Sequence, residues 1–170
     1  MAKVTKTEGK APRKPSAAEL FVMPRALLSM FAAPSVGRLT YLFPRWLGDK
    51  LSGVPGLTPP RVMLMWLLSR MNEPTMGEIA QALDLTPRAI TRLTDGLVEE
   101  GFVERIPDPL DGRVFRLKLT KQGSSEFKSL EPQLLSHFTS LFSCLDKTEI
   151  RELIRLSEKL SDHMKASFEG

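Results

Sequence analysis

The predicted helix that follows Thr86 carries outward side chains whose types and spacing are suited to reading nucleic acid. Four of them recur at the i, i+3, i+4 and i+7 positions of one helix face: Arg88, Thr91, Arg92 and Asp95. An Arg guanidinium can donate two hydrogen bonds to a guanine edge, and a Thr side chain can contact a base or a methyl group. The alternative for an isolated amphipathic helix is an ordinary solvated face. The elements around the helix therefore decide what this face does.

The start of this helix is marked by Thr86 as the N-cap residue and by Pro87 at the first helical position. The N-terminal end of a helix carries partial positive charge and unpaired N–H groups, so it favours phosphate. We therefore expect Thr86 and Pro87 to lie at the backbone of a bound nucleic acid.

A second predicted helix comes just before, separated by a short turn at Asp84 and Leu85. Thr75 and Glu78 have the spacing of a capping box at its start. Apolar side chains form an inner face on both helices: Met76, Ile79, Ala80 and Leu83 in the first, and Ile90, Leu93 and Leu97 in the second, which stops at Gly101. The segment is therefore predicted to be a helix-turn-helix.

A β-hairpin with a charged tip follows, with predicted strands at 102–106 and 114–119. A helix-turn-helix joined to such a hairpin is a winged helix. This module most often places one helix in the major groove of DNA and its wing on the backbone or in the minor groove. A narrow minor groove concentrates negative potential, which suits Arg113 at the tip, and Arg116 is a weaker candidate for a phosphate contact. The alternative for Arg113 is an ion pair with Asp111, which would contribute little.

Apolar helices flank the winged segment on both sides, and the predicted fold class is mainly α (α+β). We divide the chain into a basic, partly disordered arm at 1–34, a helical dimerisation region at 35–55 and 123–170, and a winged helix-turn-helix at 56–122. The flanking helices exceed what a small winged module needs. We therefore expect a dimer core shared by two chains, and packing within a monomer is the alternative.

Prolines are expected to shape the flanking helices. Pro24 and Pro34 should kink or bound a short helix at 17–33, and Pro132 should interrupt the long helical region after the hairpin. The helix that begins after Thr58 is apolar nearly all round, which indicates burial.

Net charge gives little support to DNA binding. The 170-residue chain has a formal net charge of +4, but residues 1–25 alone hold six basic and two acidic side chains, so the remainder is neutral overall. The placement of individual arginines must carry the argument. A winged-helix module that binds proteins and has no DNA function is the alternative, favoured by this near-neutral body.

Several other classes of protein are not favoured by the sequence. The single cysteine, Cys144, rules out an intramolecular disulfide and fits a reducing cytoplasm. No apolar run approaches the roughly 20 residues that span a bilayer, and Pro24 and Arg25 argue against a cleaved signal. His137 and His163 are far apart, and no metal, cofactor or catalytic motif is visible, so we expect neither a cofactor nor an enzyme.

Three segments carry a resemblance to the MarR family of bacterial transcriptional regulators. They are GLTPPRVMLMWLL at 56–68, IAQALDLTPRAITRLTDGLVEEGFVER at 79–105 and DPLDGRVFRLKLTKQG at 108–123. The resemblance implies a triangular homodimer that binds a pseudo-palindromic operator on double-stranded DNA, most often as a repressor. It also implies that Arg113 reaches the minor groove while Asp111 steadies it.

The resemblance further implies release from DNA by a small aromatic or oxidising effector. Five residues lie on the two helices that border the effector cleft in this family: Tyr41, Arg45, Trp46, Met63 and Trp66. An apolar aromatic pocket with one cation would suit a lipophilic carboxylate or phenol, and ordinary core packing is the alternative. The reactive cysteine of the peroxide-sensing branch lies near the first helix. Cys144 lies near the C-terminal helices instead, so we expect a small buried apolar residue there, and redox sensing is the alternative.

Overall fold

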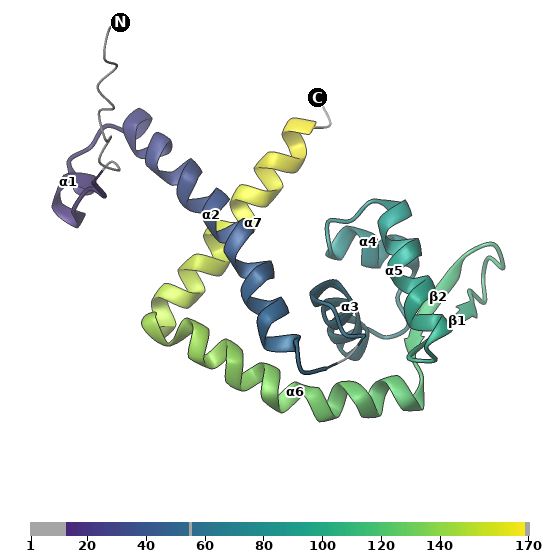
Figure 1. Cartoon of the computed structure of the whole chain (residues 1–170). Coiled ribbons are helices and arrows are strands. Elements are labelled where there is room, and N and C mark those ends of the chain that lie inside the picture. Colours follow the sequence, from purple (N-terminus) through teal and green to yellow (C-terminus); the bar gives the residue numbers. More distant parts are fainter. Residues whose placement is uncertain (1–12, 55, 169–170) are drawn as a thin grey trace, which may run out of the picture. The chain divides into compact units, whose positions relative to one another are not determined.

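The computed structural model describes residues 13–54 and 56–168 (Figure 1). Its elements are α1 (Ala17–Phe21), α2 (Arg25–Leu51), α3 (Pro59–Arg70), α4 (Met76–Ala82), α5 (Pro87–Glu99), β1 (Val103–Pro107), β2 (Phe115–Leu119), α6 (Lys121–Leu141), a 3-10 turn η1 (Phe142–Cys144) and α7 (Lys147–Phe168). The prediction of a mainly helical chain with a small sheet is confirmed. The chain divides into two compact units, residues 1–49 and 50–170.

The first unit contains α1 and nearly all of α2. Ser16 and Glu19 form a capping box that starts α1. Two effects of Pro34 were predicted, a kink or a helix end. The helix end is wrong, because α2 runs from Arg25 to Leu51 with Pro34 and Pro44 inside it. Each proline removes one backbone N–H from the helix, and the bonds on either side are enough to continue it. The boundary that we placed at residue 34 thus falls inside α2, and the arm at residues 1–12 lies outside the described residues.

Most apolar side chains of α2 are exposed, among them Leu39 and Tyr41. By length and composition alone α2 would suffice to cross a membrane, although no single apolar run in the sequence is that long. The same composition is expected of a helix that packs against another chain.

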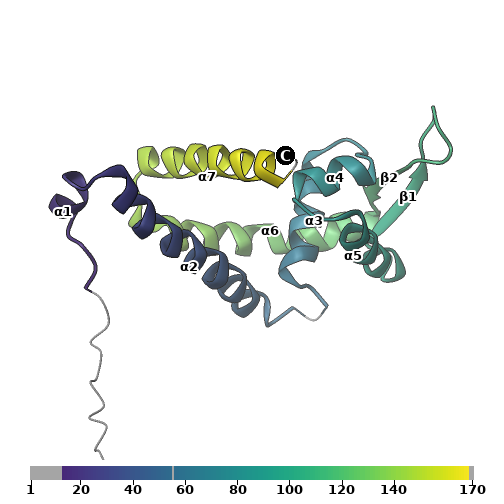
Figure 2. The same ribbon diagram turned by 90° about the horizontal axis from the view of Figure 1, so that it is seen from above.

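The core of the second unit lies between α3 and the elements around it. α3 contacts α5, α6 and β2, and it buries Val62, Leu64, Met65 and Leu68. This confirms the predicted burial of that helix. Ile79 of α4 and Leu97 of α5 are also fully buried. Figure 2 shows α3 beside α6, with the α4–α5 pair and the hairpin at the same end of this unit.

Local capping fixes the two helices of the predicted helix-turn-helix. The Thr75 hydroxyl accepts from the Glu78 N–H at 3.2 Å, and the Glu78 carboxylate accepts from the Thr75 N–H at 2.7 Å. Thr86 Oγ1 accepts from the Ala89 N–H at 3.2 Å at the start of α5. After α5, Gly101 adopts a φ of 75°, which lets the chain turn into β1. The predicted starts and the predicted stop are confirmed.

The hairpin pairs β1 and β2 antiparallel, with Val103 opposite Leu119. Thr120 then joins the hairpin to α6: its hydroxyl donates to Gly101 O at 2.6 Å and accepts from the Gly123 N–H at 3.0 Å. A Cβ on Gly123 would lie 2.0 Å from Phe102 O. Glycine is therefore required where α6 approaches the backbone before β1.

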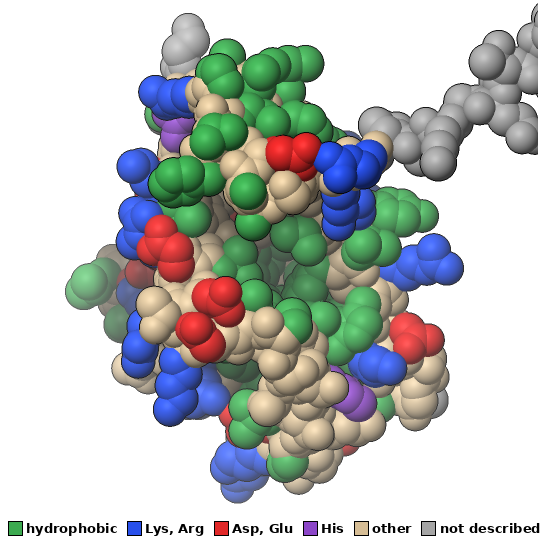
Figure 3. Space-filling view, turned by 90° about the vertical axis from the view of Figure 1, so that its left-hand side faces the viewer, with side chains coloured by type: hydrophobic (Ala, Val, Ile, Leu, Met, Phe, Trp, Pro, Cys, Tyr) green, Lys and Arg blue, Asp and Glu red, His purple; other side chains and the backbone are tan. Residues whose placement is uncertain are grey.

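The C-terminal helices differ from the prediction at one point. α6 is continuous through Pro132, so the predicted interruption is wrong. The predicted capping box at Asp146 and Glu149 is confirmed at the start of α7. No side chain of α7 is buried, and its apolar residues include Leu153, Ile154, Leu156, Leu160 and Met164. Figure 3 shows many hydrophobic side chains on one face of the molecule.

Candidate nucleic-acid interface

One face of α5 is exposed and basic. Arg88, Thr91 and Arg92 are exposed on it, while Ile90 and Leu97 on the other side are buried in the core. Within the described residues, neither Arg88 nor Arg92 has an ion-pair partner. Both guanidinium groups are therefore available for an external acceptor.

Two other residues of this face have internal partners. Thr91 Oγ1 donates to Pro87 O at 2.8 Å, so its methyl group and its oxygen lone pairs remain for an external contact. Asp95 forms an ion pair with Arg105 of β1. This pair connects α5 to the hairpin, and Asp95 therefore orients the helix.

The N-terminus of α5 offers donors to an anion. Pro87 has no N–H, and the Ala89 N–H is bonded to Thr86, which leaves the Arg88 N–H at the helix end. The Thr86 hydroxyl oxygen accepts this hydrogen bond, and within residues 13–54 and 56–168 its proton has no acceptor. Thr86, Pro87 and Arg88 are all exposed, and the arrangement suits a phosphate oxygen.

Asp108 organises the loop between the strands. Its Oδ1 accepts from the N–H groups of Leu110 and Asp111 at 2.7 and 3.1 Å, and its Oδ2 accepts from Arg116 Nε at 2.7 Å. The backbone hydrogen bonds from Leu110 and Asp111, together with Arg116, hold the pKa of the Asp108 carboxyl below its ordinary value. Arg116 also donates to Glu73 O at 3.0 Å. Arg116 thus connects the wing to the loop before α4, and its phosphate contact stays a prediction.

Arg113 and Asp111 lie at the exposed end of the hairpin. Asp111 Oδ1 accepts from the backbone N–H of Arg113 at 3.0 Å. Among the residues that the structure describes, the Arg113 guanidinium has no ion-pair partner. Asp111 therefore shapes the backbone beside Arg113 and leaves its positive charge available.

Two structural arginines were not identified from the sequence. Arg61 of α3 donates to Gly56 O at 2.7 Å and to both carboxylate oxygens of Glu100 at 2.7 and 2.8 Å. The Arg61 guanidinium lies against Gly96 of α5, and a Cβ added to Gly96 would be 2.5 Å from that guanidinium. Arg61 and Glu100 are 39 residues apart, so no local pattern could indicate this contact. For Arg105, the only indication in the sequence is its place in the alternating pattern of the predicted strand.

The five predicted effector residues fall on two helices. Tyr41, Arg45 and Trp46 lie on α2 in the first unit, where the rings of Phe43 and Trp46 stack with centroids 6.2 Å apart. Met63 and Trp66 lie on α3 in the second unit, half-buried and exposed respectively. The five residues thus belong to two different compact units, and the effector cleft stays a prediction.

Cys144 is exposed in the 3-10 turn between α6 and α7, so the prediction that it is a small buried apolar residue is wrong. Throughout residues 13–54 and 56–168, no group of three or more His, Cys, Asp or Glu side chains is arranged to hold a metal ion.

Known proteins show the same arrangement. The MarR family profile matches residues 57–115. The HTH-type transcriptional regulator PapX of Escherichia coli is 30% identical over 115 residues, which cover 65% of this chain and 69% of PapX. The HTH-type transcriptional repressor IacR of Pseudomonas putida is 26% identical over 102 residues, 60% of this chain and 61% of IacR.

Among solved structures, a mutant of MarR from E. coli in complex with operator DNA has the same fold. Its TM-score is 0.69 at 23% identity, and the match covers 81% of this chain and 99% of that protein. The winged helix, the profile match and the relatives agree. The chain belongs to the MarR family of transcriptional regulators.

Proposed function

We propose that this protein is a homodimeric DNA-binding regulator, acting as a repressor, that places α5 in the major groove and the wing at the minor groove of a pseudo-palindromic operator. The observation that carries the proposal is a set of three exposed cations, two on α5 and one in the wing loop, that have no ion-pair partner among the described residues: Arg88, Arg92 and Arg113. The ion pairs Arg105–Asp95 and Arg116–Asp108 support it, because they hold α5 and the wing in place without using these cations.

Dimerisation is supported by the apolar side chains of α2 and α7 that remain exposed in a single chain. Two copies related by a two-fold axis would present two α5 helices to half-sites about one helical turn, roughly 34–36 Å, apart. The repressor IacR and the DNA complex of the MarR mutant are consistent with this mode of action. Such a regulator works in the bacterial cytoplasm, on the nucleoid, and needs no catalytic site.

An effector is the second part of the proposal. Tyr41, Arg45 and Trp46 on α2, with Met63 and Trp66 on α3, combine aromatic and apolar surface with one cation. A small lipophilic carboxylate or phenol would suit such a lining. Its binding would release the operator.

The test is a footprinting titration of the purified protein on the DNA upstream of its own coding sequence. Protection of a palindrome with two half-sites one turn apart, lost with shuffled DNA of the same composition, supports the proposal. Uniform, salt-sensitive binding to both DNAs, or no binding, would contradict it and favour the protein-binding module. The Arg92→Ala variant distinguishes a base contact from a phosphate contact. A changed base preference assigns Arg92 to base reading, and a uniform loss assigns it to phosphate.

A further inference from the structure

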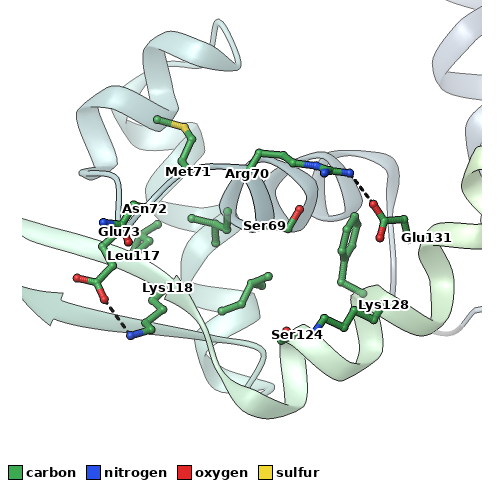
Figure 4. Close-up of a pocket in the computed structure, with 13 residues that line it drawn as sticks. Ser69, Arg70, Met71, Asn72, Glu73, Leu117, Lys118, Ser124, Lys128 and Glu131 are labelled. Atoms are coloured by element: carbon green, nitrogen blue, oxygen red, sulfur yellow. Dashed lines mark hydrogen bonds and ion pairs between the residues drawn. The ribbon is translucent and has the colours of Figure 1, made fainter.

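A cavity of about 340 Å³ opens in the second unit (Figure 4), and no residue of α5 lines it. It lies between the end of α3, the loop 71–73, β2 and the first half of α6. Three buried apolar side chains contribute to its lining: Leu68, Leu117 and Phe127. None of the five predicted effector residues lines it.

The rim of the cavity is charged, with one cation in excess. Arg70 pairs with Glu131 at 2.6 Å, and Lys118 pairs with Glu73 at 2.8 Å. Lys128 is a fifth charged lining residue, and within the described part of the chain it has no ion-pair partner. Figure 4 shows the two ion pairs at different edges of the cavity and Lys128 beside Ser124 on α6.

The ligand class follows from this combination. An unpaired ammonium favours an anion, and the neighbouring Ser124 adds a hydroxyl donor. The buried apolar side chains favour a ligand with an apolar body. The volume is at the lower end of the roughly 300–1,000 Å³ typical of small-molecule sites, which favours a small molecule over a nucleotide.

We propose that this cavity binds a small organic carboxylate, with its carboxylate at Lys128 and Ser124 and its apolar body against Leu68, Leu117 and Phe127. Binding here does not depend on DNA recognition. The site is distinct from the effector residues proposed on α2 and on α3, none of which lines it.

The cavity is also connected to the wing. Glu73 has a positive φ of 48°, which is strained for a residue with a side chain. Its carboxylate pairs with Lys118, and its carbonyl accepts from Arg116, which holds Asp108 in the wing loop. Because Glu73 lines the cavity, a bound ligand would contact the loop that carries this connection and so loosen it. This second step rests on the proposed DNA-binding function.

The experiment is a titration of the full-length protein with benzoate, and with benzamide as its uncharged isostere. Calorimetry measures the affinity, and NMR shifts of the backbone amides locate the site. Benzoate should bind at least about tenfold more tightly than benzamide, because only benzoate gains the charged contact. Amides of Leu117, Ser124 and Lys128 should shift. In Lys128→Gln the advantage of benzoate should disappear, while Lys147→Gln, a distant exposed lysine on α7, should bind like the wild type.

Equal binding of benzoate by Lys128→Gln and the wild type would overturn the proposal. So would the absence of benzoate binding, or shifts confined to amides near Tyr41 and Trp46, which would assign benzoate to the other cleft. A thermal melt of each variant checks folding, and Lys128→Arg, which keeps the charge, should retain benzoate binding. Because DNA takes no part in this titration, a failed footprint would not change its outcome.

Discussion

Replacement of Gly123 by alanine should destabilise the fold, although alanine is the better helix former. The new Cβ would lie 2.0 Å from Phe102 O, and real Cβ atoms essentially never come closer than 3.0 Å, so α6 must move away by about 1 Å. That shift stretches two hydrogen bonds: Thr120 N–H to Phe102 O at 3.0 Å and the Thr120 hydroxyl to Gly101 O at 2.6 Å.

The magnitude follows from three contributions. Overpacking costs about 1–3 kcal/mol, and each weakened hydrogen bond costs up to about 0.5–1.5 kcal/mol. The helix propensity of alanine returns about 1 kcal/mol. The expected net loss is about 3 kcal/mol of unfolding free energy.

Urea denaturation at a fixed protein concentration measures this loss as a fall in the midpoint with an unchanged slope. Gly77→Ala is the matched control, because Gly77 also lies in the first turn of a helix and its added Cβ would meet only Thr75 Oγ1, at 3.9 Å. The unfolding free energy of Gly77→Ala should rise by up to about 1 kcal/mol. A Gly123→Ala protein as stable as the Gly77→Ala protein would refute the close-approach argument.

Three further predictions concern the wing and the core. Arg113→Ala should weaken operator binding at least about tenfold without lowering the melting temperature, and unchanged affinity in a gel shift would remove Arg113 from the interface. Thr94→Val should raise the unfolding free energy by about 1 kcal/mol, because Thr94 Oγ1 is buried without a hydrogen-bond partner among the described residues. Thr91→Val on the exposed face of the same helix is its control, and equal effects in the two variants would contradict this reason. Asp108 has a pKa below its ordinary value of 3.8, so its contribution to stability is complete above that pH and is lost as the pH falls through the lower, folded-state pKa. The protection of the wing amides against hydrogen exchange, relative to the unfolded chain at the same pH, should therefore fall below about pH 3.8 in the wild type, whereas Asp108→Asn should show low protection at every pH.

Local signals in the sequence predicted the helix-turn-helix well. The capping boxes at Thr75 and Asp146 need only residues within three positions of each other, and both are present. The proline rule failed at Pro34 and Pro132. It describes the loss of one local bond, whereas the rest of the helix and its packing decide whether the helix continues.

The candidate site was predictable only in the part that depends on local sequence. Helical spacing placed the exposed arginines of α5 on one face. The partners of Arg61 and Arg116 depend on how α3, α5, the hairpin and the loop before α4 meet in space. No spacing along the chain predicts these contacts between elements, so the structural roles of Arg61 and Arg116 could not be assigned before the fold was known.

The exposed apolar row on α7 has a consequence for the abundance of this regulator in the cell. When a second copy covers such a row, folding and association become one equilibrium, and the melting temperature rises with total protein concentration. Chains present in very few copies would leave Leu153, Ile154 and Leu156 in water, open to proteases and chaperones. In the proposed dimer, the folded fraction of the regulator therefore rises with its copy number in the cell.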